Sequence, residues 1–506
     1  MPVGGLIPLT SFSPDLDPLT PGVITDANDF VPTLVGFRSL PDLTSVSQAL
    51  PSKCRGATAI TFADGDQWVV AGCCDDAGGS VSLNTVRSAD LDEMNPPAWL
   101  TQGIVPGTAP GRWRFDVFQN PNVGSEKQEI IAVDGVHHPL SATRERLEFD
   151  LRNGTNQAWE FLDGGPPIAS HVAASDFYLF LVGELEADIL HEDWPTPIVT
   201  NHWWASDHSN QWDLVIAADH ISVDGRLGQT SGPITAMLAL RSTMIAYKSA
   251  ACYIGQLQQP PSIWTFTEAS RQTGAQGQEG VIAIRDMHNF VGPDDFFTLD
   301  GFSIAAIPNS LRRWFTFRVN RMQRNAVQAR FDADRSIVFL HFPSEGDTDN
   351  DSLELNEWIA FNFVTQQWSC GKLDIRNVVA QTIRHEDDSC PGVILNDETL
   401  AIYMHDSTRT QPGAFLVTGD LGDRRNLYET QPIRPGFTLL NGTPTLTGLS
   451  TYVSGRPYTT GNTVPLTADG WFNLQLMGRM LRLRIDADAE VEIASLDVPM
   501  QPMGDA

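Results

Sequence analysis

The sequence predicts an all-β protein built around a β-propeller, and three observations support this fold class. From residue 55 onward, short runs rich in Val, Ile, Phe and Trp alternate with Gly, Asp, Asn and Pro, which is typical of strands joined by tight turns. Asp-Gly pairs, whose residues both accept the positive φ of hairpin turns, recur at blade-sized intervals and begin at Asp64, Asp134, Asp163, Asp224 and Asp300. Helical periodicity is sparse. This repetition favours a closed propeller over an array of sandwiches.

Three segments of different character follow one another along the chain. The first 45 residues contain seven prolines and almost no amphipathic period, so we expect residues 1–45 to form an extended arm that reaches a neighbouring molecule. Residues 46–410 carry the strand-and-turn pattern and are predicted to form the propeller. Residues 411–506 are predicted to form a β-sandwich-like module, because apolar residues alternate with polar ones from Leu481 to Ile485 as in a strand with one buried face.

The best helical candidate spans residues 309–329. Leu311, Trp314 and Phe315 recur there at helical spacing, opposite a face rich in arginine. We interpret this segment as a surface helix that packs between blades, in preference to a nucleic-acid contact.

The charge balance excludes tight nucleic-acid binding. The chain has 62 acidic and 33 basic side chains and a formal net charge of -29, whereas proteins that hold nucleic acid need clustered Lys and Arg. An acidic surface repels phosphates and is therefore compatible with a conduit along which DNA slides without being held.

Cysteine spacing and the N-terminal sequence point to a protein assembled in a cytoplasm. None of the six cysteines forms a C-x-x-C pair, so we expect buried free thiols instead of a zinc or redox site. The N-terminus has no basic region ahead of an apolar run, unlike a signal peptide. No apolar run approaches the roughly 18 residues of a membrane span. The cysteines are Cys54, Cys73, Cys74, Cys252, Cys370 and Cys390.

Paired carboxylates, the usual machinery of glycoside hydrolysis, are the first chemistry to consider. The adjacent pairs Asp294-Asp295 and Asp75-Asp76 would each place only one group on a given face of a strand, so turn and solvent roles are favoured. Acidic residues at alternate positions of 347–351 resemble a calcium loop, but Ser352 and Trp358 stand where Gly and Glu are required. That segment is interpreted as a solvated hairpin tip.

Histidines and tryptophans do not form a recognisable site either. The histidines lack metal-binding spacing such as H-E-x-x-H, and the tryptophans are best explained as core anchors, with a sugar-stacking platform as the alternative. No catalytic, cofactor-binding or metal-binding residue is predicted, no cofactor is expected, and the protein is expected not to be an enzyme. The histidines considered are His137, His138, His202, His208 and His220, and the platform would comprise Trp203, Trp204, Trp212 and Trp264.

A series of motifs between residues 25 and 490 resembles, in its order, the tail hub or nozzle family of short-tailed bacteriophages, often named packaged-DNA stabilisation proteins. The strongest block runs from Thr265 to Trp368, and GRMLRLRI at Gly478–Ile485 matches the closing strand of the family. Within the block stand EASRQTGAQGQEGVIAIRDMHNFVGPDDFFTLDG, IPNSLRRWF, NAVQARFDADRSIVFLHFP and NEWIAFNFVTQQWS; earlier pieces are FADGDQWVVAG, RWRFDVFQN, IIAVDGVHHP, HVAASDFYLFLVG, NHWWASDHSNQWD and AMLALRSTMIAYKSAACYIGQL.

The resemblance implies a six-bladed propeller that assembles as a hexameric ring in the phage virion, below the portal and adaptor. Its lumen would be a conduit and gate for retention and ejection of the genome, with DNA passing transiently and without tight binding. Fibre, spike or plug proteins would be further partners. The N-terminal arm has no counterpart in these motifs.

Four arginines on the helical segment are candidate gate or intersubunit contacts, namely Arg312, Arg313, Arg321 and Arg324. The alternative function is a carbohydrate-binding or carbohydrate-hydrolysing propeller that recognises a host receptor, which would require carboxylates converging in one pocket.

Overall fold

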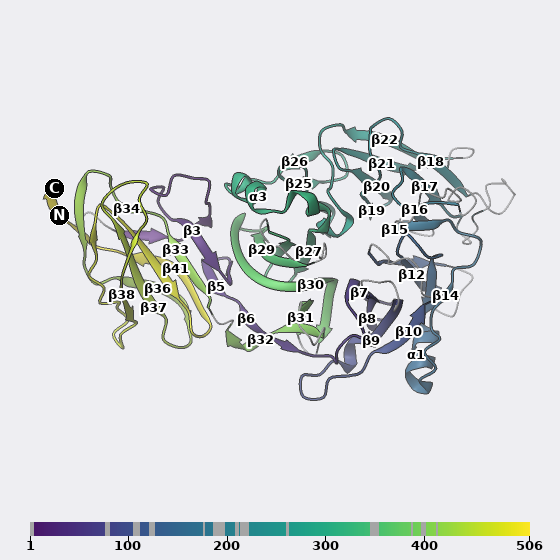
Figure 1. Ribbon diagram of the computed structural model, residues 1–506, viewed down its shortest axis with the longest axis horizontal. Helices are drawn as coiled ribbons and strands as arrows, with labels where there is room; N and C mark the ends of the chain where they lie inside the picture. The colour runs from purple at the N-terminus through teal and green to yellow at the C-terminus, as the bar shows by residue number, and fades with distance from the viewer. Residues whose placement is uncertain are drawn as a thin grey trace.

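The computed structural model shows a ring of β-sheet blades with a β-sandwich beside it (Figure 1). None of the helices among the described residues is long and apolar enough to cross a membrane. The structure describes residues 5–75, 81–104, 112–120, 127–175, 178–185, 198–207, 212, 222–259, 263–344, 354–385, 388–395, 401–410 and 413–505.

Five blades of the propeller are consecutive four-stranded antiparallel sheets. Blade 1 comprises β7 (Cys54–Thr61), β8 (Gln67–Cys74), β9 (Val81–Arg87) and β10 (Leu100–Ile104), followed by blade 2 with β11 (Arg114–Gln119), β12 (Gln128–Val133), β13 (Leu140–Thr143) and β14 (Glu160–Phe161). Blade 3 comprises β15 (Ile168–Ser175), β16 (Tyr178–Glu184), β17 (His202–Ala205) and β18 (Val223–Arg226), and blade 4 comprises β19 (Ala236–Leu240), β20 (Thr243–Lys248), β21 (Ala251–Leu257) and β22 (Trp264–Ser270). Blade 5 comprises β23 (Val281–Ile284), β24 (Met287–Val291), β25 (Phe296–Leu299) and β26 (Ile304–Ala306).

The last two blades share one long strand, β30 (Gln367–His385). Blade 6 consists of β27 (Gln328–Asp332), β28 (Ile337–Phe342), β29 (Leu355–Asn362) and the first half of β30. The second half of β30 is the innermost strand of blade 7, which continues with β31 (Asp388–Leu395), β32 (Ile402–Thr410) and β6 (Pro41–Ser45). Val379 of β30 also bridges to Ala57 of β7 in parallel, so blade 7 meets blade 1 and the ring is closed.

The β-propeller predicted from the sequence is confirmed, but the number of blades differs. The resemblance implied six blades, whereas the described residues form seven: four are separate four-stranded sheets, and three are parts of one 11-stranded sheet. The difference arises at β30, because its continuous run of 19 residues serves two blades, and at β6, because a strand from before the propeller completes the last blade by pairing with β32.

The N-terminal segment is also different from the extended arm that its prolines predicted. Its residues contribute β1 (Leu6–Pro8), β2 (Ser11–Phe12), β3 (Val23–Asn28), β4 (Phe30–Pro32) and β5 (Phe37–Ser39) to the sandwich. Prolines stand at the ends of these strands or between them, where a missing N–H breaks no ladder hydrogen bond. The segment therefore packs within its own chain.

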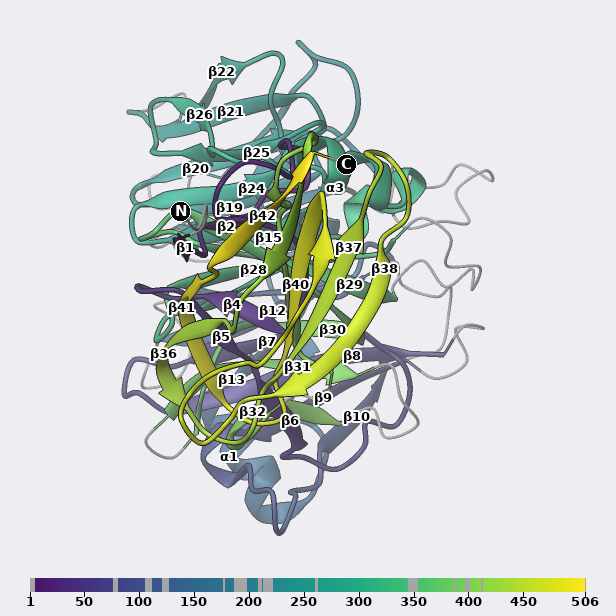
Figure 2. The same ribbon diagram turned by 90° about the vertical axis from the view of Figure 1, so that its left-hand side faces the viewer.

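The sandwich joins both ends of the chain. One sheet has the order β1-β41-β5-β4 with β36 beside β41, the second has the order β2-β3-β33-β40-β37-β38 with β34 beside β40, and a small third sheet is β39-β35-β42. The C-terminal strands are β33 (Phe415–Thr418), β34 (Leu421–Gly422), β35 (Asn426–Thr430), β36 (Arg434–Leu440), β37 (Thr445–Thr451), β38 (Thr459–Pro465), β39 (Met477–Gly478), β40 (Met480–Asp486), β41 (Val491–Asp497) and β42 (Met500–Asp505). Figure 2 views this part of the molecule face-on. As the alternation predicted, Leu481 and Ile485 of β40 are fully buried.

Helices are few and short. The segment predicted as a helix over 309–329 is divided into α3 (Arg312–Arg318) and the 3₁₀ helix η3 (Arg321–Ala326). The 3₁₀ helices η1 (Ser88–Asp90) and η2 (Gln278–Gly280) lie between strands. A further helix that the sequence did not predict, α1 (Arg144–Asn153), begins where the Thr143 hydroxyl accepts a hydrogen bond from the Arg146 N–H and ends at Gly154 with a φ of 61°, both common capping arrangements.

Four of the five Asp-Gly pairs mark turns, as predicted. Their glycines have φ between 81° and 96°, a range that other residues rarely adopt. These are Gly65, Gly135, Gly164 and Gly301. The fifth pair is different, because Gly225 lies inside β18. A Cβ atom there would come within 2.7 Å of the Trp203 ring, so this glycine provides room for a tryptophan.

Candidate functional site

The axis of the propeller encloses a narrow channel lined by both polar and apolar residues. This cavity of about 300 Å³ is lined by the innermost strand of every blade, namely β7, β11, β15, β19, β23, β27 and the second half of β30. Because one water molecule occupies about 30 Å³ of liquid, the channel has room for a small ligand and not for a nucleic acid.

Two carboxylates line this channel, and the first is ion-paired. Glu279 of η2 forms an ion pair with Arg114, whose Nε lies 2.8 Å from Oε1 and whose Nη2 donates to Oε2 at 3.4 Å, and Arg112 Nη1 lies 3.7 Å from Oε2. Burial alone would raise the pKa of Glu279, but Arg114 and Arg112 outweigh it and hold the pKa below its usual value. Glu279 is therefore an ionised carboxylate at neutral pH.

The second carboxylate, Asp116 of β11, has the opposite character. Burial raises its pKa to about 6, although the N–H groups of Ala174 and Val117 each donate to it at 2.8 Å and oppose the shift. The cavity is thus lined by one carboxyl group whose pKa is raised and one whose pKa is lowered, and such a difference is used in general acid catalysis.

Neither carboxylate was predicted from the sequence, although the sequence of β11 contains a signal. Arg112, Arg114 and Asp116 stand at alternate positions of RWRFDVFQN, so their side chains share one face of a strand. Charged residues on the face of an innermost strand mark the axial channel. Glu279 had no comparable signal, because η2 is an irregular turn between blades.

The four candidate arginines cluster around α3 and η3, and none of them lines the axial channel. Arg312 forms an ion pair with Asp294, and Arg324 donates to the Pro293 carbonyl oxygen. The guanidinium carbons of Arg313 and Arg321 lie 5.8 and 5.9 Å from the centre of the Phe317 ring, which is 60% exposed. Their role as gate or intersubunit contacts stays a prediction.

Two of the other carboxylates weighed from the sequence, Asp294 and Asp295, are partners of the same arginine. Asp294 and Asp295 flank Arg312, at the β24–β25 turn, and Asp295 also accepts from the Asn309 amide at 2.7 Å. Both therefore fasten α3 to blade 5. Asp76 and the acidic segment 347–351 lie outside the described residues.

The candidate histidines have structural partners. His137 contacts Asp134, and His202 is buried between Glu184 at 2.9 Å and Asp224 at 2.7 Å. His138 packs edge-on against Phe161, while His208 and His220 lie outside the described residues. In the part of the chain that the structure describes, no three His, Cys, Asp or Glu side chains gather as a metal site would require.

The buried aromatic and sulfur groups belong to the core. The four tryptophans considered as a sugar platform are at most 6% exposed, which identifies them as core residues. The thiols of Cys54, Cys73, Cys74, Cys252 and Cys370 are buried and form no disulfide bonds.

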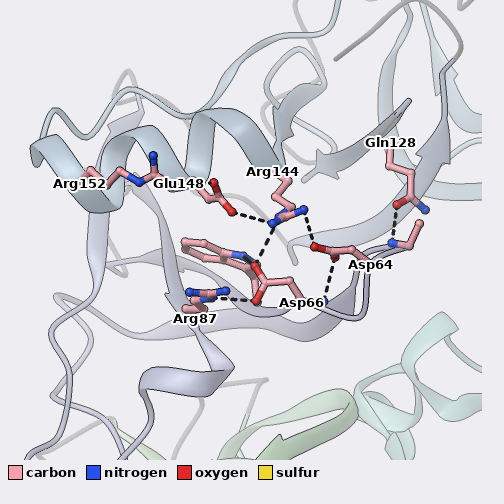
Figure 3. A network of polar contacts seen from close by, with 9 residues as sticks. Asp64, Asp66, Arg87, Gln128, Arg144, Glu148 and Arg152 are labelled. Carbon is pink, nitrogen blue, oxygen red and sulfur yellow. Dashed lines mark hydrogen bonds and ion pairs between the residues drawn. The ribbon is translucent and has the colours of Figure 1, made fainter. Parts of the chain in front are cut away.

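A network of ion pairs joins blades 1 and 2 at the first hairpin turn (Figure 3). Arg144 of α1 contacts Asp64 and Asp66 of the β7–β8 turn and Glu148 one helical turn later. Asp66 also receives Arg87 at 2.8 Å. Each of these acids is paired with an arginine, so the network holds the two blades together.

Comparison with known proteins gives only distant structural matches. No protein-family model and no curated protein matches the sequence. An exo-β-1,3-galactanase from Phanerochaete chrysosporium matches at 9% identity and a TM-score of 0.27, over 90% of this chain and 100% of the other. An α-L-arabinanase from Penicillium chrysogenum matches at 10% identity and a TM-score of 0.29, over 74% and 99%. An α-L-arabinofuranosidase from Fusarium graminearum matches at 10% identity and a TM-score of 0.25, over 73% and 96%.

These matches run against one expectation from the sequence. All three are carbohydrate-active enzymes, which contradicts the expectation that this protein is not an enzyme, so that expectation is withdrawn. They belong to the class of the alternative function and include no phage tail protein. At such identities and TM-scores the likeness concerns the fold alone and gives no residue correspondence. The fold that is shown is a β-propeller.

Proposed function

We propose that this chain is a subunit of the tail nozzle of a short-tailed bacteriophage, assembled as a ring below the portal and adaptor. The order of the sequence motifs supports the proposal, and one structural observation carries it. The strongest motif block, Thr265–Trp368, forms blade 5, α3 and most of blade 6, and these elements are where the propeller is joined to the sandwich.

The joint is built on α3. The Arg313 and Trp314 N–H groups both donate to the Asp15 carboxylate, at 2.6 and 3.0 Å, which satisfies N–H groups at the start of the helix. Phe12 of β2 packs edge-on against Trp314 with ring centres 5.1 Å apart. The segment Arg313–Phe315, one of the motifs that carry the resemblance, thus joins the propeller to the sandwich. A subunit in the wall of a tube requires such a rigid connection.

Packing continues across this joint without interruption. One buried apolar cluster extends from Phe296 and Phe315 on the propeller side to Leu481 and Leu483 in the sandwich. Because buried area of this kind stabilises by roughly 25 cal/mol per Å², the two parts resist separation. A tube wall under internal pressure needs that resistance.

The passage for DNA would lie between subunits. The axial channel of one propeller is too narrow for a duplex, so the conduit must be enclosed by several copies. With a net charge of -29 per chain, such a lumen would repel phosphates and let the genome slide.

Electron microscopy of the purified protein, alone and with the adaptor of the same phage, tests this function. We expect closed rings with an open centre, six subunits being the number that the resemblance implies, and incorporation below the adaptor. A protein that stays monomeric in mass photometry at every concentration, with and without adaptor, would contradict the proposal.

A second candidate function, hydrolysis of a glycan in the axial channel, is favoured by the presence of both Asp116 and Glu279 in the lining of that channel. One carboxyl has its pKa raised to about 6 and the other is ionised, as a general acid and a nucleophile or base would be. Asp116→Asn and Glu279→Gln should each lower reducing-sugar release from arabinan or β-1,3-galactan at least 100-fold, while Asp300→Asn, at an exposed hairpin tip, should not. Equal rates in all three variants would exclude this site.

A further inference from the structure

A second cavity, far from the axial channel, lies on the sandwich. This groove has a volume of about 850 Å³ and lies between the end of β35, the segment before β39 and the start of β42. Figure 1 shows the C-terminus, which follows β42, at the end of the sandwich that faces away from the propeller. The groove is lined by Gln431, Pro432, Trp471, Asn473, Pro499, Gln501 and Pro502.

The lining is aromatic and amide-rich, with no ionisable side chain. Trp471 provides the flat apolar surface, and Gln431, Asn473 and Gln501 provide amides, each with a donor and an acceptor. The Gln431 amide donates to the Gln501 carbonyl oxygen at 3.4 Å, a weak hydrogen bond that a ligand can replace. A neutral molecule with many hydroxyl groups and an apolar face satisfies this lining best.

The backbone holds Trp471 in place before any ligand arrives. The tight turn 467–471 is closed in both directions, since the Trp471 N–H donates to the Thr467 hydroxyl at 3.0 Å and the Thr467 N–H donates to the Trp471 carbonyl at 2.9 Å. The next residue, Phe472, pairs with Ile433 through two backbone hydrogen bonds of 2.9 and 3.0 Å. This pairing fixes the tryptophan beside Gln431 and Pro432.

Further contacts fix the ring and the opposite wall. The Arg434 guanidinium carbon lies 5.4 Å from the centre of the Trp471 ring, within the range of a cation–π contact. The Gln431 N–H donates to the Pro499 carbonyl at 2.9 Å, and three of the seven lining residues are prolines, whose backbone is already restricted. Little ordering entropy is lost on binding to such a groove.

We propose that this groove binds a neutral oligosaccharide, with one sugar ring stacked on Trp471 and its hydroxyl groups bonded to Gln431, Asn473 and Gln501. A proline-rich peptide would also contact an aromatic surface, but it would leave most of the amide groups without a partner. The inference concerns the sandwich alone and goes beyond both proposed functions, so ring assembly or channel hydrolysis can fail without affecting it.

An array of neutral gluco-, galacto- and manno-oligosaccharides, followed by titration calorimetry with the best binder, tests the groove. Trp471→Ala should weaken binding at least tenfold, and Asn473→Ala, at an exposed position that cannot disturb the core, should weaken it several-fold. Tyr452→Ala is the matched control, because Tyr452 is an aromatic residue of the sandwich that is 53% exposed and does not line the groove.

Three results would overturn the inference. They are silence across the array, binding that Trp471→Ala and Asn473→Ala leave unchanged, and binding of a proline-rich peptide that neutral sugars fail to displace. Circular dichroism of each variant, together with unchanged ring assembly, would show that loss of binding is local.

Discussion

At the scale of single residues, buried carboxyl groups make the stability of this protein depend on pH. Asp29 is 4% exposed and has a φ of 53°. Burial raises its pKa to about 7, and the Asn28 amide, which donates to it, offsets only part of this. The folded state therefore favours the protonated form, so the stability from this group is complete below pH 4 and is lost as the pH rises through about 7.

Asp29→Asn should consequently stabilise the protein at pH 8 and have little effect at pH 4. Asparagine tolerates the same backbone conformation, and the gain at pH 8 should be about 2–4 kcal/mol, since each pKa unit corresponds to about 1.4 kcal/mol. Thermal unfolding at the two pH values measures this difference. Asp300→Asn, at a hairpin turn, is the control. If Asp29→Asn gave the same gain in stability at both pH values, removal of the buried charge would not be the cause of that gain.

At the scale of elements, strands with strong local patterns could be predicted and those defined by distant partners could not. The alternation from Leu481 to Ile485 and the turn at Asp300-Gly301 depend on nearby residues, and both were predicted correctly. The role of residues 41–45 could not be predicted, because β6 is a strand only through its pairing with β32, about 360 residues later. The axial carboxylates Asp116 and Glu279 likewise come together only when seven blades close into a ring.

Closure of the ring by β6 leads to a prediction at the same scale. The Val46 N–H donates to the Ile402 carbonyl. Every second pair of an antiparallel ladder is hydrogen-bonded in this way, so the Thr44 N–H is expected to donate to the carbonyl of its partner, Met404. Thr44→Pro removes that donor and should destabilise the protein by about 3 kcal/mol.

Limited proteolysis and the melting temperature measure the effect of Thr44→Pro. We expect a lower melting temperature and new cleavage near residues 46–50, where β6 leads into blade 1. Thr44→Ala keeps the N–H and should resemble the parent protein, so equal behaviour of the two variants would show that β6 does not close the ring.

At the scale of the whole molecule, the propeller and the sandwich should unfold together, because one apolar cluster spans both. Phe12, which is 1% exposed, lies in this cluster and contacts Trp314. Phe12→Ala should lower the stability by about 3–5 kcal/mol and should move one calorimetric transition as a whole. Two separate transitions, of which only one shifts, would show that the parts are independent.

The shared sandwich also determines when folding can be completed. The antiparallel partners of β3 and β6 are β33 and β32. At 5–20 residues per second a ribosome needs roughly 20–70 s to reach them. Throughout that interval the apolar residues of the first 45 positions stay exposed. A cell that produces this chain must therefore shield its leading segment, and yield should depend on chaperone supply and on a slow rate of synthesis initiation.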